Sequence, residues 1–508
     1  MSRYRKALVA SGHTLVSEAG ATILKEGGNA FDAVVAAGFA AAVAEPSLTS
    51  LGGGGLLVGY DQRRGQSLFF DFFVNTPGMG RKPQRDNLHF FPVTIQFSGS
   101  TQDFNVGLGS VAVPGNLKGL IHVHRRLGRM GLAQVIAPAR ELARGHTLNK
   151  QQGNFFSLLY PILTMTERGR SLYERDGRFV QAGDTIKNPD AVSFFDQLAH
   201  DHGREFYEGE LARRIDTEMR AGGGLLSAED LRAYEVYERK PLAINYRDYR
   251  LLTCPGPSVG GAMIGLSLSL LEHSGVGAQR WGDGAYLVRT LGLMREVERL
   301  RADGFSADSH LSSFLADHAA VTSSIDRIRL FSRGTTHISV ADKMGNCASM
   351  TFSNGEGSGY IAPGTGVMLN NMMGEDDLHP DGFHLDPPGL RVASMMSPSL
   401  LIKDETVRLV IGSGGSKRIR TSMGQVLSQV FDYGRSLTEA VEAPRLFWDG
   451  EAVQIEPGFS DEALAELKRY APINVWDDLD VYFGGVHAVI PGETGAGDPR
   501  RGGSVVEV

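Results

Sequence analysis

The sequence predicts a layered α/β fold. Its first half is rich in helical patterns, and its second half carries pairs of alternating apolar and polar runs that are typical of β-hairpins. Helices and sheets in such a mixture usually pack in layers around one core. No linker that would separate independent domains is evident in the 508 residues, and 42% of them are hydrophobic, which is ample for a large core.

Composition and charge exclude several classes of protein. The net charge is −7 without a long charge run, which argues against a nucleic-acid partner. Two cysteines, Cys254 and Cys347, are too few for a disulfide framework and form no CxxC, so we expect reduced thiols and no metal site. The longest apolar stretch, residues 30–44, contains Asp32 and is too short to span a bilayer. Because the N-terminal residues lack the apolar core of a secretory signal, we expect a cytoplasmic protein.

The first half of the chain predicts several helices and one early strand. Residues 17–28 favour a helix closed by two glycines, and residues 29–45 favour a buried, Ala-rich helix that ends before Pro46. Four glycines then lead into a strand. Helical patterns follow at 117–127 and 132–144.

A β-hairpin is predicted in the second half. Alternating runs at 337–341 and 347–353 flank a short polar turn at 342–346. Thr335 therefore lies at the start of a strand, directly after Gly334. If the bond between these two residues is cut, Thr335 gains an α-amino group with a pKa of about 7.7–8.0. This amine could take the proton of its own residue's hydroxyl, which suits an N-terminal nucleophile.

A strand at 407–411 leads into Gly412-Ser413-Gly414-Gly415-Ser416, and a helix is expected from about Arg418. A strand–loop–helix unit invites a nucleotide-binding interpretation, but the spacing matches neither GxGxxG nor GxxxxGK[ST]. The same geometry offers backbone N–H groups at a helix N-terminus, which suit an oxyanion.

Motifs along nearly the whole chain resemble the gamma-glutamyltransferase family. They are GGNAFDAVVAAGFAAAVAEPSLTSLGGGG, then GTTHISVADKMGN, PGTGVMLNN and SMMSPSL, in that order. The resemblance implies a four-layer αββα sandwich of an N-terminal-nucleophile hydrolase, made as a proenzyme that cleaves itself. Residues 1–334 would form the heavy chain and residues 335–508 the light chain, intertwined in one domain.

The resemblance also implies the catalytic residues. Thr335 would attack the carbonyl of Gly334 during self-cleavage, and later the acyl donor. Ser353 stands where the family has a second, supporting threonine, and it keeps the hydroxyl. Gly414 and Gly415 match a Gly-Gly pair that holds the oxyanion. Water or an amine would accept the acyl group, and no cofactor or metal is implied.

The positions that would bind the donor depart from the family pattern. Phe73 takes the place of an arginine that binds the α-carboxylate of the glutamyl group. Met372 takes the place of a glutamine. Of a serine pair that helps to bind the carboxylate, Ser394 remains and the second member is Met395. A carboxylate buried beside these apolar side chains would be costly without a partner.

Other donor-binding positions are closer to the family. Glu375 fits an acidic residue that binds the α-amino group. Gly355 replaces an asparagine, although Asn354 lies beside it. Another arginine, such as Arg391, or a shifted loop could compensate for Phe73.

The sequence thus predicts a self-cleaving threonine hydrolase or acyltransferase that acts on a gamma-glutamyl or related amide. We expect that its donor specificity has changed toward a less polar amide or acyl group. Two alternatives stay open. One is an acylase of the same family that acts on a small acyl amide or a β-lactam side chain. The other is an uncleaved relative without enzyme activity.

Overall fold

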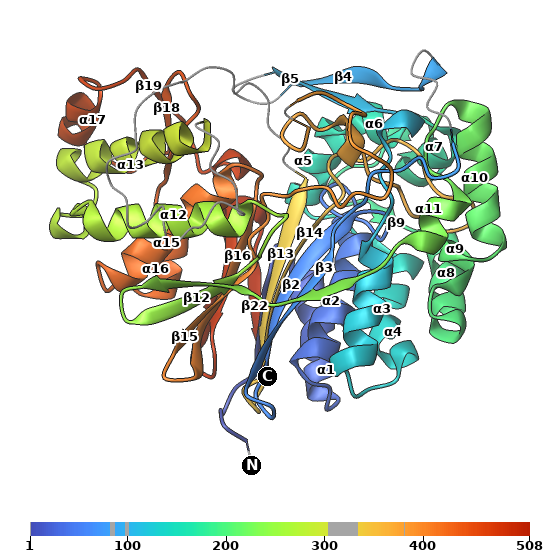
Figure 1. Ribbon diagram of the computed structural model, residues 1–508, viewed down its shortest axis with the longest axis horizontal. Coiled ribbons are helices and arrows are strands. Elements are labelled where there is room, and N and C mark those ends of the chain that lie inside the picture. Colours follow the sequence, from blue (N-terminus) through green and yellow to red (C-terminus); the bar gives the residue numbers. More distant parts are fainter. Residues whose placement is uncertain (1, 82–86, 97–100, 303–333, 380) are drawn as a thin grey trace.

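Two antiparallel sheets lie face to face in the centre of the protein, and helices cover both outer sides (Figure 1). The computed structural model describes residues 2–81, 87–96, 101–302, 334–379 and 381–508. Strands from before and after residue 334 take part in both sheets. This arrangement confirms the predicted layered α/β fold.

The first sheet joins the central hairpin to the N-terminal strands. Its seven strands lie in the order β10 (Tyr237–Arg239), β3 (Gln66–Phe72), β2 (Gly54–Asp61), β14 (Cys347–Ser353), β13 (Thr335–Ala341), β1 (Leu8–Ser11) and β22 (Ser504–Glu507). Its outer face is covered by α1 (Thr14–Lys25), α2 (Ala30–Ala44), α3 (Asn116–Leu127) and α4 (Leu132–Arg144). Helix α2 is apolar all round because it packs between the sheet and other helices.

The second sheet carries the glycine-rich loop. Its six strands lie in the order β11 (Leu242–Tyr246), β12 (Tyr249–Thr253), β15 (Ser399–Lys403), β16 (Thr406–Gly414), β20 (Gly485–Ile490) and β21 (Thr494–Ala496). The outer helices on this side are α12 (Gly260–His273), α13 (Gly284–Ala302), α15 (Arg418–Phe431) and α16 (Leu437–Glu442).

Shorter elements surround this core. The helices are α5 (Lys150–Leu158), α6 (Tyr160–Leu163), α7 (Glu167–Tyr173), α8 (Pro189–Asp201), α9 (Arg204–Tyr207), α10 (Glu210–Gly222), α11 (Ala228–Ala233) and α17 (Asp461–Leu467). The strands are β4 (Phe91–Gln96), β5 (Thr101–Val106), β6 (His146–Thr147), β7 (Glu174–Arg175), β8 (Arg178–Phe179), β9 (Thr185–Ile186), β17 (Leu446–Trp448), β18 (Val453–Ile455) and β19 (Ile473–Val475).

The central hairpin of β13 and β14 is buried on both faces. One face packs on α2, and the other faces the second sheet. Small polar side chains on that second face tie the sheets together. Ser339 Oγ donates to the carbonyl of His487 at 3.0 Å, and Ser349 Oγ donates to the carbonyl of Ile411 at 2.9 Å. These bonds satisfy buried hydroxyls and hold the hairpin against the sheet that carries the Gly-rich loop.

Most predicted elements in the described ranges are confirmed, with small shifts at their ends. The clearest difference is β16, which was expected to end at Ile411 but continues through Gly414. Gly412 and Gly414 continue the ladder, opposite His487 and Gly485 of β20. Residues 303–333, which belong to the end of the expected heavy chain, lie outside the described residues.

The described residues also bear on membrane, disulfide and metal sites. Within these ranges, no helix is both long enough and apolar enough to cross a bilayer. The two cysteines are buried and free, as their number and spacing predict. Across the same residues there is no cluster of three or more His, Cys, Asp or Glu side chains that could hold a metal ion.

Candidate active site

Thr335 is the first residue of β13 and is 5% exposed. Its main chain is held on both sides. The N–H of the preceding Gly334 donates to Glu356 Oε1 at 3.2 Å, and Nη1 of Arg501 donates to the carbonyl of Thr335 at 2.7 Å. The bond between Gly334 and Thr335 is therefore fixed in position at the open end of the hairpin, opposite its turn.

The hydroxyl of Ser353 connects the two sides of this bond. Ser353 is the last residue of β14 and lies directly opposite Thr335 in the ladder. Its hydroxyl accepts from Thr335 Oγ1 at 3.3 Å and from the N–H of Gly355 at 3.0 Å, and it donates to the carbonyl oxygen of Gly334. The single proton and both lone pairs of the Ser353 hydroxyl are thus used in hydrogen bonds. A single side chain contacts both the hydroxyl of Thr335 and the carbonyl that precedes it.

Two glycines at this site leave no room for a side chain. A Cβ on Gly334 would lie 1.6 Å from the carbonyl oxygen of Gly355. A Cβ on Gly414 would lie 2.3 Å from the carbonyl oxygen of Thr335. The end of β16 therefore touches the main chain of Thr335, and Gly415 follows with a positive φ of 116° before α15 begins. This brings Gly414 and Gly415 next to Thr335.

A small cavity opens beside Thr335. Seven residues that the sequence singled out line it: Phe73, Thr335, Ser353, Met372, Glu375, Ser394 and Met395. Four further residues complete the wall: Leu378, Met396, Ser416 and Ile419. Gly334, Asn354, Gly355, Gly414 and Gly415 are not among the lining residues; they form the surrounding backbone, and Asn354 is 1% exposed.

The wall of this cavity is apolar apart from four hydroxyls and one acid. Phe73 and Met372 are each 2% exposed, and Met395 is 6% exposed. Glu375, at 8% exposure, is the one charged side chain among the described residues that line the cavity. The three apolar replacements, Phe73, Met372 and Met395, thus line the same cavity.

Arg391 does not replace the missing cation. Its Nη1 donates to the carbonyl of Phe73 and, at 2.7 Å, to Tyr234 Oη, and its Nη2 donates to the carbonyl of Glu235 at 2.6 Å. Its Nε lies 3.5 Å from Asp71 Oδ1. The guanidinium therefore stays behind Phe73, outside the cavity, and the suggestion that it compensates is wrong.

A buried polar cluster lies behind Thr335. Glu45 is 4% exposed, and the hydroxyl of Thr336 donates to it at 3.2 Å. Burial raises the pKa of Glu45 to about 7, although the Thr336 hydrogen bond and the charge of Arg501 oppose this shift. Burial also lowers the pKa of His487 to about 3. His487 Nδ1 accepts from the N–H of Asp498 at 3.1 Å, so the neutral ring carries its proton on Nε2.

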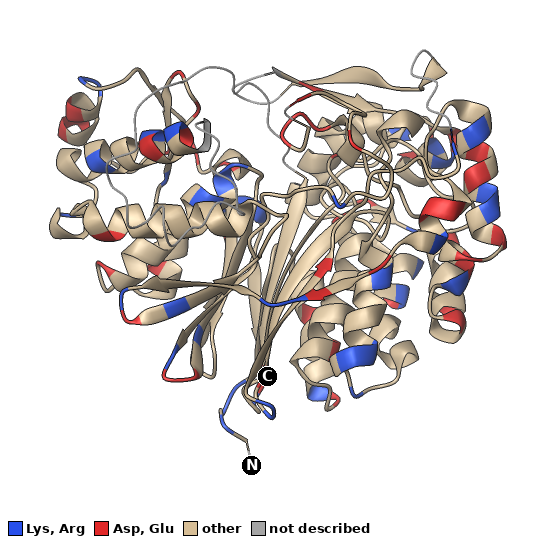
Figure 2. Ribbon diagram, in the orientation of Figure 1, with Lys and Arg blue, Asp and Glu red and all other residues tan. Residues whose placement is uncertain are grey.

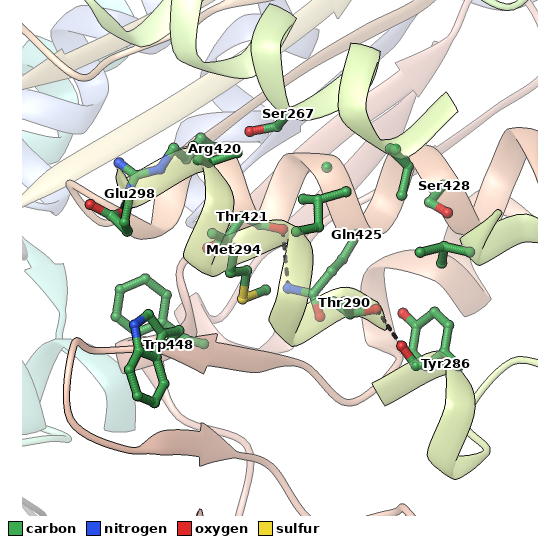
Figure 3. Close-up of a pocket in the computed structure, with 16 residues that line it drawn as sticks. Ser267, Tyr286, Thr290, Met294, Glu298, Arg420, Thr421, Gln425, Ser428 and Trp448 are labelled. Carbon is green, nitrogen blue, oxygen red and sulfur yellow. Dashed lines mark hydrogen bonds and ion pairs between the residues drawn. The ribbon is translucent and has the colours of Figure 1, made fainter. Parts of the chain in front are cut away.

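A second, larger cavity lies away from the hairpin between α12, α13, α15 and β17 (Figure 3). Its wall is mostly apolar. Figure 3 shows Arg420 paired with Glu298 at one end and Trp448 nearby. No residue that the sequence singled out belongs to its described wall. We therefore place the site at the smaller cavity.

Sequence reasoning missed several residues of the site. Arg501 lies in the C-terminal part and reaches Thr335 across 166 positions, so no local signal points to it. Glu45 had a weak signal, since it is an acid at the end of an otherwise apolar helix. Ile419 and Leu378 are ordinary apolar residues that become part of the wall only in the folded chain.

Comparison with known proteins places the chain in a family. The sequence pattern of the family described as Gamma-glutamyltranspeptidase matches residues 16–508. The chain belongs to the gamma-glutamyltranspeptidase family. It is 30% identical to the glutathione hydrolase proenzyme of Escherichia coli (strain K12), over 92% of this chain and 85% of that protein. It is 31% identical to the acylase ACY 1 proenzyme of Pseudomonas sp. (strain V22), over 91% and 86%.

A solved structure shows the same fold. The cephalosporin acylase from Bacillus halodurans superposes with a TM-score of 0.83 at 24% identity, and the match covers 99% of this chain and 96% of that one. The relatives of this chain thus include both glutathione hydrolases and acylases. The protein is an enzyme of this family.

Proposed function

We propose that this chain is the precursor of a threonine hydrolase and acyltransferase. The Gly334–Thr335 bond is cut, and Thr335 becomes the nucleophile. The observation that carries the proposal is the hydroxyl of Ser353, which accepts from Thr335 Oγ1 and donates to the carbonyl of Gly334. The word "proenzyme" in the names of both curated relatives supports it. Residues 1–334 and 335–508 would then be two chains of one intertwined fold.

In the first step, Thr335 Oγ attacks the carbonyl carbon of Gly334. Ser353 stabilises the negative charge that develops on the carbonyl oxygen, because it already donates to that atom. The bond to the Thr335 nitrogen then breaks, this nitrogen takes a proton, and an ester between Gly334 and Thr335 Oγ forms. Water hydrolyses the ester and leaves a carboxylate on Gly334 and a free hydroxyl and amine on Thr335.

In turnover, the same hydroxyl attacks an amide donor that enters the cavity. The new α-amino group of Thr335 takes the hydroxyl proton and later gives it to the leaving amine. The backbone N–H groups of Gly414 and Gly415 hold the oxyanion, and each such donor is typically worth about 3–4 kcal/mol. Water or an amine then takes the acyl group from Thr335.

An acylase that acts on a donor without the glutamyl head is the second candidate. It is favoured by one observation, the apolar wall formed by Phe73, Met372 and Met395. Both candidates use the same nucleophile and differ only in the acyl group.

The experiment that tests the shared chemistry compares Thr335→Ala with Thr335→Ser. Each variant is incubated with an acyl p-nitroanilide, and the acyl-enzyme is trapped and located by peptide mass spectrometry. We expect acylation of residue 335 in the wild type and slower acylation in Thr335→Ser. Acylation at another residue, or turnover by Thr335→Ala, would overturn the proposal.

A further inference from the structure

We propose that a cleft at the far end of the β13–β14 hairpin binds a small molecule that carries two or more phosphate groups. The cleft lies where the turn of this hairpin meets the N-terminal segment, the turn between β2 and β3, and the end of α3. Figure 2 shows Lys and Arg on the N-terminal segment and on the short loop beside it. The site is thus at the opposite end of the hairpin from Thr335.

The wall of this arginine cleft is strongly basic. Asp61 is the one acid among its described lining residues, whereas the whole chain has a net charge of −7. A concave site of one sign of charge attracts ions of the opposite sign. Five lining residues are arginines: Arg3, Arg63, Arg64, Arg126 and Arg129.

The single acid of the wall is engaged by its own turn. Asp61 is 8% exposed, and its Oδ1 accepts from the N–H groups of Arg63 and Arg64 at 3.0 and 3.2 Å. Its Oδ2 lies 3.6 Å from Nε of Arg64. This carboxylate therefore holds the turn between β2 and β3 and pairs with one guanidinium of the cleft.

Two other arginines are held in place by neutral acceptors. Arg3 donates to Gln62 Oε1 at 2.6 Å and to Thr406 Oγ1 at 2.7 Å. Arg129 Nε donates to the main-chain carbonyl of Gly27 at 2.8 Å. These contacts orient both guanidinium groups, and because the acceptors carry no charge, they leave the positive charge of the cleft in place.

Arg63 is the arginine best placed to bind a ligand. It is exposed, and its guanidinium makes no hydrogen bond or ion pair with another described residue. Arg126 pairs with Glu238 Oε1 at 3.3 Å, and His122 lies 3.0 Å from the same oxygen. Within the described chain, Arg3, Arg63 and Arg129 thus have no acidic partner.

Linked phosphate groups match this wall. Each phosphate carries about 1.5–2 negative charges at pH 7 and three strong acceptor oxygens. The planar fork of a guanidinium group binds two such oxygens at once. Five arginines against one aspartate leave an excess of four positive charges, which two or three phosphates would offset. Inorganic polyphosphate and nucleoside polyphosphates share this chemistry.

The ligand would also connect both parts of the chain. The arginines precede residue 334, whereas Met344 and Asn346 of the wall follow it. The side chain of Met344 is 44% exposed at the turn of the hairpin and offers an apolar surface beside the charges. Because the cleft exists only in the folded protein, a bound ligand should raise the thermal midpoint.

Calorimetric titration of the purified protein without divalent cations tests the proposal. The probes are inorganic phosphate, tripolyphosphate, ATP and citrate. We expect tripolyphosphate to bind at least about 100-fold more tightly than phosphate, because each added phosphate forms further charge-assisted hydrogen bonds. Citrate, whose charges lie on carboxylates, should bind about 10-fold more weakly than tripolyphosphate. ATP that binds more tightly than tripolyphosphate identifies a nucleotide site, and the reverse order identifies an inorganic polyphosphate site.

Three variants test the assignment to the cleft. Arg63→Gln should weaken tripolyphosphate binding by about 10-fold. Arg63→Lys keeps the charge but loses the fork, so it should weaken binding by about 3-fold. The matched control is Arg125→Gln, which removes an exposed charge from α3 outside the wall and should weaken binding by less than about 2-fold. The thermal midpoint without ligand shows whether each variant is folded.

Several results would overturn the proposal. One is equal binding of phosphate and tripolyphosphate, or of citrate and tripolyphosphate, and another is no binding of tripolyphosphate. Equal weakening by Arg63→Gln and Arg125→Gln would show that the anion responds only to overall charge. Sedimentation with phosphatidylserine vesicles, without binding of tripolyphosphate, would assign the arginines to a membrane surface instead.

The outcome does not depend on the proposed function. Thr335→Ala keeps every residue of the arginine cleft, and we expect it to bind tripolyphosphate like the wild type whether or not the chain is cut. Loss of binding in this variant, while it remains folded, would contradict a site that is separate from Thr335.

Discussion

Ser353 and Gly334 are joined by a hydrogen bond in which the serine hydroxyl donates to the carbonyl of the residue before Thr335. In Ser353→Ala this donor is lost, and we expect self-cleavage to slow by about 100-fold, as for the loss of one oxyanion donor. Ser353→Thr keeps the hydroxyl and should be cut at a rate within a few-fold of the wild type. The fraction of cut chain against time, measured on denaturing gels, checks this. Cleavage of Ser353→Ala at the wild-type rate would remove Ser353 from the mechanism.

Gly334 is needed for the close approach of its chain to Gly355. In Gly334→Ala, the new Cβ would lie 1.6 Å from the carbonyl oxygen of Gly355, so the segment must move away from Ser353. We expect self-cleavage to slow by at least about 10-fold. Gly292→Ala in α13 is the control, because a Cβ there meets no atom within 4 Å. If both variants are cut like the wild type, the steric argument is wrong.

The buried carboxyl group of Glu45 should make the free energy of unfolding depend on pH. Burial raises its pKa from the ordinary value of 4.5 to about 7 in the folded protein. The folded state then binds more protons than the unfolded state between these two values, so stability is lost as the pH rises toward 7. Glu45→Gln removes the titrating carboxyl group and with it this contribution to the pH dependence. Relative to the wild type, its free energy of unfolding should rise by about 2–3 kcal/mol from pH 5 to pH 8.

Chemical denaturation of both proteins at these two pH values measures the difference. A free-energy difference that stays constant between pH 5 and pH 8 would show that Glu45 is ionised throughout, despite its burial. The hydrogen bond from Thr336 and the charge of Arg501 would then be what keeps Glu45 ionised.

Gly424 offers a stabilising substitution away from the site. It lies within α15 on the wall of the larger cavity, and a Cβ there meets no atom within 4 Å. Alanine loses less backbone entropy than glycine on folding, so Gly424→Ala should stabilise the protein by about 0.5–1 kcal/mol. The shift of the thermal midpoint measures this, with turnover as the control. A lower midpoint would mean that the helix packs more closely there than the structure shows.

The sequence predicted the parts of the fold that local pattern determines. The hairpin of β13 and β14 follows from period-2 alternation around a polar turn, and both strands formed at the expected residues. The extension of β16 to Gly414 was missed, because it depends on pairing with β20, which is remote in the chain. Propensity argues against glycine in a strand, and tertiary pairing overrides it here.

The site likewise contains residues that local sequence predicts and residues that depend on contacts between remote parts of the chain. Thr335, Ser353 and the donor-pocket positions could be predicted because each belongs to a short motif. The position of Arg391 was not predictable, since it depends on Asp71, Phe73 and Tyr234, which approach it only in the folded chain. Residues that act through long-range contacts, such as Arg501, carry no local signal.

Intact-mass spectrometry of the purified protein, combined with N-terminal sequencing, tests the central claim most directly. The account predicts two chains, one ending at Gly334 and one beginning at Thr335, and a single uncut chain for Thr335→Ala. A wild-type protein that remains one chain, or a Thr335→Ala variant that is cut at the same bond, would contradict it.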